Sequence, residues 1–193
     1  MMSATTLHVE DKNGVRILRI QSEDGTNRLT RALVDAFTDV VHELSHSPRP
    51  FIVTGNDRFF SAGADLAEIA SFNGPAAYEF SKIGQQFMQS INNFPAPVYA
   101  AISGYCMGGG LDLALACHHR IAAPHTLFGH RGAALGLITG WGGTQRLPRL
   151  IGKARALEMF LAAEKVSATR ALEIGLVDAV VEDPIAEAMR RIA

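Results

Sequence analysis

Two glycine-containing segments have residue types and spacing suited to stabilising negative charge on a bound molecule. The first, Phe60–Leu66 (FSAGADL), places small residues around Gly63. The second, Gly104–Asp112 (GYCMGGGLD), has three consecutive glycines where a strand is expected to lead into a helix. A helix N-terminus presents free N–H groups and the positive end of the helix dipole, and glycine lets a ligand approach them closely. The two segments therefore indicate an oxyanion site built from main-chain N–H groups.

Each segment also has a purely structural interpretation. Gly63 could belong to a tight connection into a helix capped by Asp65, and the glycines could allow a helix to pack closely on a strand. The second segment matches neither the GxGxxG pattern nor the GxxxxGK[ST] pattern, so the sequence supports no nucleotide site.

Composition limits the classes of partner. The net charge of −1 excludes a broad basic surface, so we expect neither nucleic-acid binding nor attachment to an anionic membrane. Cys106 and Cys117 form neither a disulfide framework nor a metal-binding spacing, and we expect no metal site. Met1–Glu10 contains no apolar run typical of a signal peptide or a membrane span. We therefore expect a soluble, cytoplasmic protein.

The hydrophobic pattern predicts one α/β domain in which strands and helices alternate. The expected strands are Val15–Ile20, Phe51–Thr54, Val98–Ile102, His119–Ala122 and Leu176–Val181. The expected helices are 30–44 with Thr30 as N-cap, one starting at Pro75, 111–116, 144–150, 154–162, 168–174 and a fragment after Pro184. We expect a loop at 56–61 and a glycine-rich loop before Gly143.

These segments resemble the motifs of the crotonase (enoyl-CoA hydratase/isomerase) superfamily. Besides Phe60–Leu66, the similar stretches are Pro97–Gly110, Gly140–Ala154 and Ser167–Asp178, so the resemblance runs from about Val15 to Val181. It implies a spiral of ββα units that binds acyl-CoA, with no cofactor, in fatty acid metabolism. It also implies a homotrimer or a dimer of trimers.

The resemblance further implies the roles of particular residues. The main-chain N–H groups of Ala64 and Gly109 would polarise the thioester carbonyl. Main-chain contacts to CoA would come from Ala62, Ala64, Asp65, Leu66 and Gly109. The single domain would span 1–193, with the spiral core at about 1–140 and a short, truncated helical portion at about 141–193. The walls of the acyl pocket would come partly from 72–78 and 135–141.

The sequence departs from the family pattern at the two acid/base positions. A hydratase of this family positions and activates one water with two glutamates. Asp112 occupies the first position and keeps a carboxylate with a shorter reach, although it could simply complement the helix dipole. Gly132 occupies the second position and has no side chain to carry a proton. Ordinary hydration or isomerisation by a carboxylate pair is therefore in doubt.

Two substitutes for the missing glutamate stay open. A histidine side chain ordinarily titrates near neutrality, so His130 could take part in catalysis, or it could be a structural histidine. A bound anion is the other substitute, because the family's naphthoate synthases carry glycine here and use bicarbonate. The rest of that subgroup's pattern is absent around 137–139.

The default hypothesis is a hydratase-like lyase that stabilises a thioester enolate or oxyanion. The alternatives are a CoA-thioester hydrolase or decarboxylase that uses the same site, and a non-catalytic acyl-CoA-binding protein. Gly132 favours the last alternative, whereas Asp112 with Ala64 and Gly109 favours an enzyme.

Overall fold

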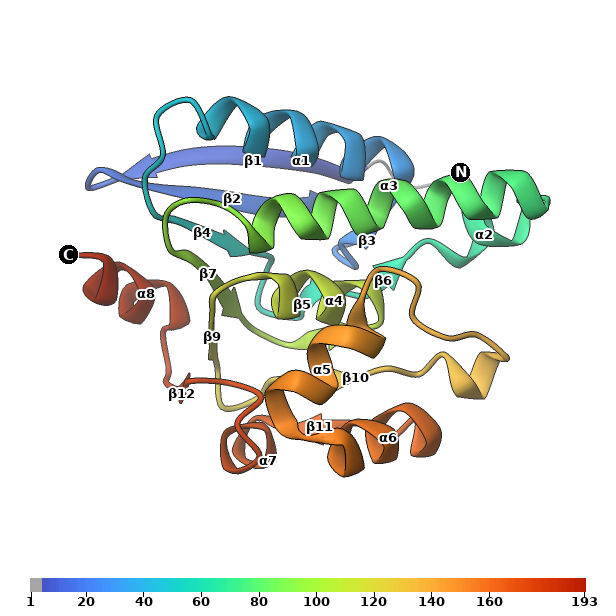
Figure 1. Ribbon diagram of the computed structural model, residues 1–193. Coiled ribbons are helices and arrows are strands. Elements are labelled where there is room, and N and C mark those ends of the chain that lie inside the picture. Colours follow the sequence, from blue (N-terminus) through green and yellow to red (C-terminus); the bar gives the residue numbers. More distant parts are fainter. Residues whose placement is uncertain (1–4) are drawn as a thin grey trace.

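The computed structural model describes residues 5–193, which form three β-sheets surrounded by helices (Figure 1). The largest sheet has the strand order β1-β2-β4-β7-β9-β12. Its strands are β1 (Thr5–Lys12), β2 (Val15–Ser22), β4 (Phe51–Thr54), β7 (Val98–Ile102), β9 (His119–Ala122) and β12 (Ala179–Val180). Only β1 and β2 pair antiparallel in this sheet, and the other neighbours are parallel.

Two smaller sheets accompany the large one. The four-stranded sheet has the order β11-β10-β8-β5, and β3 pairs with β6 in the two-stranded sheet. Their strands are β3 (Arg28–Leu29), β5 (Phe59–Ser61), β6 (Gly63–Ala64), β8 (Tyr105–Met107), β10 (Leu127–Gly129) and β11 (Val166–Ser167). The parallel pairs β3–β6, β5–β8 and β8–β10 bring together segments far apart in the sequence.

The chain repeats one unit along this framework. A strand of the large sheet is followed by a strand of a small sheet and then by a helix, as in β2–β3–α1, β7–β8–α4 and β9–β10–α5. Each unit advances the chain by one position in the large sheet, so the units wind into a spiral of ββα repeats. The predicted α/β class and spiral are therefore confirmed.

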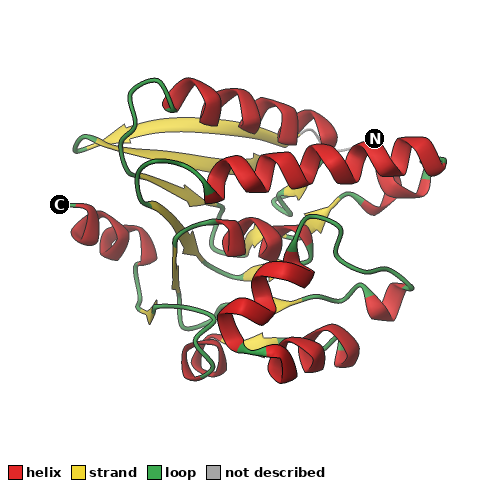
Figure 2. Cartoon of the chain, viewed as in Figure 1, coloured by secondary structure: helices red, strands yellow, loops and turns green. Residues whose placement is uncertain are grey.

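The helices cover both faces of the large sheet (Figure 2). They are α1 (Arg31–Leu44), α2 (Leu66–Ala70), α3 (Gly74–Asn92), α4 (Gly109–Ala116), α5 (Gly143–Ile151), α6 (Lys153–Ala162), α7 (Ala168–Glu173) and α8 (Pro184–Ile192), with a short 3-10 turn at Ala133–Leu135. Because strand side chains alternate between faces, Leu18 and Val53 join the main core while Ile17 and Ile52 pack towards α8.

Local sequence explains where the two long helices begin. Thr30 caps α1, because its hydroxyl accepts a hydrogen bond from the N–H of Leu33. Asn73 caps α3 through the N–H of Ala76, and Pro75 lies in the first turn, where it needs no N–H partner. The prediction of Thr30 as N-cap is thus confirmed, and the helix expected at Pro75 begins one residue earlier.

Several parts of the sequence-based prediction differ from the structure. Strand β1 was not predicted, because its side chains are mostly exposed and carry little hydrophobic pattern. The expected loop 56–61 contains β5, whose pairing with β8 comes from residues far along the chain. The expected strand 176–181 is reduced to β12. Within residues 5–193, no helix is both long and apolar enough to cross a membrane.

Candidate active site

A cavity of about 440 Å³ lies where β6, β8 and the start of α4 meet α2, α3 and the segment 130–141. Apolar side chains form much of its wall: Leu66, Ile69, Phe72, Phe80, Met107, Leu135, Leu137, Ile138 and Trp141. The cavity is also lined by five residues with polar side chains: Ser81 on α3, and Asp112, His130, Arg131 and Thr139. The cavity is therefore an apolar site with a few polar groups at one place, as is typical of small-molecule sites.

Two strands and a helix bring Ala64 and Gly109 together. Ala64 ends β6, whose partner β3 fixes its register through Leu29. Gly109 begins α4, so its N–H belongs to the helix N-terminus. A Cβ atom built on Gly109 would lie 3.3 Å from the nitrogen of Ala64, which shows how closely the two main chains approach.

Glycine is required at Gly63 and Gly109 for this approach. Gly63 has φ +94°, and a Cβ there would lie 2.7 Å from the carbonyl oxygen of Met107. A Cβ on Gly109 would lie 2.8 Å from the indole of Trp141. A side chain at position 63 would push β6 away from β8 and the start of α4, and one at position 109 would displace the indole of Trp141.

Asp112 and His130 form a buried pair beside these N–H groups. The Oδ1 atom of Asp112 lies 3.5 Å from Nε2 of His130, and the two side chains are 1% and 4% exposed. Neither atom has a hydrogen-bond partner among residues 5–193. The other carboxylate oxygen, Oδ2, accepts a hydrogen bond from the hydroxyl of Thr139. Buried polar atoms without partners are rare in native proteins and are often found at functional sites.

Burial shifts both groups towards their uncharged forms. It raises the pKa of Asp112 to about 6, although the hydrogen bond from Thr139 and the charge of Arg146 lower it. Burial lowers the pKa of His130 to about 4. At neutral pH, the pair therefore consists of a carboxylate that is still close to its pKa and a neutral imidazole.

The position of Gly132 is closed by the main chain that follows it. Its carbonyl oxygen accepts hydrogen bonds from the N–H groups of Leu135 and Leu137, which curls residues 132–137 into a tight loop. A Cβ built on Gly132 would lie 2.6 Å from the carbonyl oxygen of Leu137. The loop thus occupies the space into which a side chain at 132 would extend.

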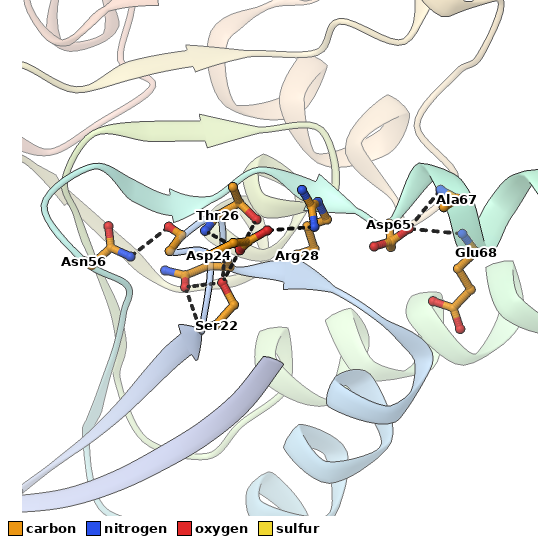
Figure 3. A network of polar contacts seen from close by, with 10 residues as sticks. Ser22, Asp24, Thr26, Arg28, Asn56, Asp65, Ala67 and Glu68 are labelled. Atoms are coloured by element: carbon orange, nitrogen blue, oxygen red, sulfur yellow. Dashed lines mark hydrogen bonds and ion pairs between the residues drawn. The ribbon is translucent and has the colours of Figure 1, made fainter. Parts of the chain in front are cut away.

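The predicted CoA-binding residues separate into two groups. Ala62, Ala64, Leu66 and Gly109 line the cavity. Asp65 does not, and its carboxylate instead accepts hydrogen bonds from the N–H groups of Ala67 and Glu68, which caps α2 (Figure 3). The structural interpretation of Asp65 as a helix cap is therefore confirmed for its side chain, and contact of its main chain with CoA stays a prediction.

The sequence did not indicate that Thr139 and Gly143 contact the pair formed by Asp112 and His130. Thr139 was considered only as part of a pocket wall, yet it bonds to Asp112. Gly143, at the start of α5, lies so close to Asp112 and His130 that a Cβ atom there would collide with both. The only sequence signal was the position of these residues in the glycine-rich stretch 139–143. Among the described residues, no three His, Cys, Asp or Glu side chains are grouped to hold a metal ion.

A family model described as "Enoyl-CoA hydratase/isomerase" matches residues 10–192. The chain belongs to the enoyl-CoA hydratase/isomerase family. It is accordingly an enzyme of the enoyl-CoA hydratase/isomerase type, in which the exact reaction depends on the residues of the site. Acyl-CoA is the substrate class of this family.

Relatives with known names support this assignment. The chain is 41% identical to a probable enoyl-CoA hydratase of Bacillus subtilis, over 91% of this chain and 68% of the relative. It is 35% identical to a crotonyl-CoA hydratase of Syntrophomonas wolfei, over 94% of this chain and 71% of the relative.

Solved structures of family members have the same fold. The structure of Pseudomonas aeruginosa DspI matches with a TM-score of 0.92 at 34% identity, over 100% of this chain and 75% of that one. An enoyl-CoA hydratase from Thermoplasma volcanium matches with a TM-score of 0.92 at 30% identity, over 98% and 76%. The predicted crotonase superfamily is therefore confirmed.

Proposed function

We propose that this family member adds water to the double bond of a 2-enoyl-CoA, with Asp112 and His130 in place of a pair of glutamates. The observation that carries the proposal is the apposition of Asp112 Oδ1 and His130 Nε2, both buried and both without a hydrogen-bond partner among the described residues. Both residues line the cavity that also contains Ala64 and Gly109. A small opening between the two buried side chains would let one water hydrogen-bond to both atoms.

The thioester carbonyl would lie against the N–H groups of Ala64 and Gly109. Fixed N–H donors stabilise charge that develops on the carbonyl oxygen without any reorganisation, and removing one such donor typically costs about 100- to 1,000-fold in rate. The N-terminus of α4 adds the positive end of its dipole. The acyl chain would extend along the apolar wall that includes Phe72, Phe80 and Trp141.

The proton transfers would then run through Asp112. The carboxylate takes a proton from the bound water as the water oxygen bonds to C3, and the electrons of the C2–C3 double bond move to the carbonyl oxygen. Asp112 next returns this proton to C2, which regenerates the carboxylate and the thioester. His130 remains neutral and orients the water through a hydrogen bond, in keeping with its lowered pKa.

Two features favour this function over the alternatives. Asp112 supplies an acid/base group and His130 supplies a hydrogen-bonding group for the water, neither of which a non-catalytic binding protein would need. The carbonyl oxygen of Leu137, beside Gly132, would repel an anion and fills the space beside that residue, so bicarbonate has little room there. A thioester hydrolase or decarboxylase could use the same N–H groups and is therefore the second candidate.

The test follows crotonyl-CoA by the absorbance of its conjugated thioester. We expect turnover by the wild-type enzyme, and a loss of about 100-fold or more in kcat for Asp112→Asn and for His130→Gln. Fluorescence of Trp141, the single tryptophan, reports butyryl-CoA binding. We expect the two variants to bind within about threefold of the wild type, because they remove groups used in chemistry rather than in binding.

Asp35→Asn is the matched control, since Asp35 is exposed on α1 and should leave both measurements unchanged. Tight binding without turnover of crotonyl-CoA would contradict hydration. Release of free CoA from saturated or malonyl thioesters would instead support the second candidate.

Cytoplasmic location, a role in fatty acid metabolism and assembly as a homotrimer or dimer of trimers belong to the same proposal. Leu157 and Leu161 on α6 are 57% and 68% exposed, and such apolar side chains are suited to contact with another subunit. Light scattering of the purified protein measures the assembly directly. A monomer at micromolar concentration would contradict the trimer.

A further inference from the structure

We propose that Asn27 is a positioning residue for the oxyanion hole and acts through Ser61 on the strand that carries Ala64. Neither residue lines the cavity, and both are fully buried. The inference rests on the proposed function of Ala64 and Gly109 as donors to the thioester oxygen. Its test below uses a ligand that cannot be hydrated, so that it does not depend on the acid/base chemistry.

Asn27 is held in a conformation that few residues adopt. It is fully buried and has φ +54°, in the left-handed region. Its side-chain NH2 group donates a hydrogen bond to the carbonyl oxygen of Phe59 at 2.8 Å, and its side-chain oxygen accepts one from the N–H of Ser22 at 3.1 Å. Asn27 therefore joins the end of β2 to β5, two elements that do not pair as strands.

Ser61 carries this connection towards the site. Its hydroxyl donates a hydrogen bond to the carbonyl oxygen of Asn27 at 2.7 Å and accepts one from the N–H of Gly63 at 3.0 Å. The N–H of Ala62 donates to the carbonyl oxygen of Thr26 at 2.9 Å. Residues 26–27 thus hold both sides of the bend that leads to Ala64.

Ser61 also contacts α4, the helix that carries the N–H group of Gly109. A Cβ built on Gly110 would lie 2.7 Å from Cβ of Ser61, so α4 packs directly on Ser61. Gly109 precedes Gly110 in this first turn. Ser61 therefore lies between β6, with Ala64, and α4, with Gly109, and a shift of Ser61 would change the distance between the two N–H groups.

A polar network that includes Ser22, Asp24 and Arg28 surrounds this part of the chain (Figure 3). The hydroxyl of Ser22 accepts a hydrogen bond from the N–H of Asn27 at 2.8 Å and donates one to Asp24 at 2.8 Å. Asp24 also forms an ion pair with Arg28 at 2.9 Å. The side-chain NH2 of Asn56 donates to the carbonyl oxygen of Gly25. These contacts tie residues 22–28 to one another and to Asn56.

The expected consequence is a loss of alignment rather than of binding. An oxyanion hole works because its donors already point at the place where charge develops, and small displacements weaken that interaction. Loss of the Asn27 side chain would free β5 and, through Ser61, the N–H of Gly63. The binding of CoA depends on many other contacts and should change much less.

The experiment measures the carbonyl stretching frequency of enzyme-bound butyryl-CoA, isotope-labelled at its thioester carbon, by infrared difference spectroscopy. Butyryl-CoA has no double bond to hydrate, so its spectrum reports carbonyl polarisation alone. We expect the wild type to shift the band to lower frequency and Asn27→Gly, which tolerates positive φ, to lose at least half of that shift. Its butyryl-CoA affinity should stay within about threefold of the wild-type value.

Thr126→Val is the matched control, because the buried hydroxyl of Thr126 donates to the carbonyl oxygen of Ile102 at 3.0 Å away from the cavity. It should lower thermal stability while keeping the full shift. Should Asn27→Gly fail to fold, Ser61→Ala breaks only the last link and should also lose at least half of the shift. A full shift in a folded Asn27→Gly or Ser61→Ala variant would overturn the inference. Bound butyryl-CoA without any shift in the wild type would refute the proposed donors and, with them, this inference.

Discussion

Asp112 and His130 face each other in the interior with 3.5 Å between Oδ1 and Nε2, and the main-chain N–H groups of Trp141 and Gly143 also stabilise the carboxylate of Asp112. Burial favours the uncharged form of each residue. His130 therefore stays neutral at neutral pH, and Asp112 ionises only near pH 6. Proton uptake by this pair is therefore linked both to the stability of the fold and to the proposed reaction.

The first prediction concerns stability as a function of pH. The pKa of Asp112 is about 6 in the folded state against an ordinary value of 3.8, so ionisation of Asp112 removes stability as pH rises from about 4 to 6. The pKa of His130 is about 4 against 6.5, so stability is lost as pH falls from about 6.5 to 4. The two effects oppose each other, and the wild-type dependence in this window should be shallow.

Single substitutions should reveal how each residue alone changes the free energy of unfolding with pH. In Asp112→Asn, the free energy of unfolding should rise with pH between about 4 and 6.5, by at most roughly 3 kcal/mol. In His130→Gln it should fall over about the same range by a similar amount. Urea unfolding at several pH values measures both. Parallel curves for the two variants would show that these groups are not the ones that titrate.

The second prediction concerns the pH dependence of activity. Proton abstraction from water needs the carboxylate form of Asp112, so kcat/KM should fall tenfold per unit as pH decreases below about 6. Stopped-flow rates with crotonyl-CoA measure this decrease in kcat/KM at low pH before the protein unfolds. A profile that stays flat down to about pH 5 would mean that Asp112 is not the base.

The third prediction concerns the absence of a side chain at Gly132. Gly132→Glu adds the carboxylate used by other hydratases of the family, but its Cβ would lie 2.6 Å from the carbonyl oxygen of Leu137. We expect a loss of about 1–3 kcal/mol in stability and no gain in hydration rate, because the loop must move to admit the side chain.

Ala133→Glu supplies the control, since it adds the same charge at the next, exposed position. Its free energy of unfolding should change by less than about 0.5 kcal/mol. A Gly132→Glu enzyme that is as stable as Ala133→Glu and hydrates crotonyl-CoA faster than the wild type would show that the loop does not close this position.

The fourth prediction concerns the support of Trp141. A Cβ on Gly84 of α3 would overlap the indole of Trp141, whose ring also lies against Gly109. Gly84→Ala should therefore displace the indole and destabilise the protein by about 1–3 kcal/mol, despite the better helix propensity of alanine. The emission of the single tryptophan and the KM for crotonyl-CoA measure the displacement.

Gly74→Ala, at the start of the same helix, adds a methyl group into open space. It should leave both the emission spectrum and KM unchanged. If Gly84→Ala behaves in the same way, the indole is not held by α3.

Several features of the site could be predicted from the sequence because they depend on short, contiguous patterns. The glycines around 63 and 108–110 indicated an approach to main-chain N–H groups, and Gly63 does have the positive φ that requires glycine. Thr30 was predicted as an N-cap from its place before a helical pattern. The family resemblance located Asp112 and Gly132 relative to the family's two glutamates.

Other features could not be predicted, because they join residues that the sequence keeps apart. Strand β5 was expected to be a loop, since its three residues gain their strand character only by pairing with β8. Thr139 had no local pattern to indicate its bond with Asp112. The closure of Gly132 depends on two hydrogen bonds that curl the following residues back over it.

The sequence by itself determined the family, because four ordered motifs resemble those of the superfamily, and this resemblance implied the ββα spiral and the N–H groups of Ala64 and Gly109. Only the tertiary structure placed His130 opposite Asp112 and Asn27 behind Ser61. Parallel strands require long crossovers, so residues that share a site come from different units. Burial among those units, rather than the identity of either residue, gives Asp112 and His130 their shifted pKa values.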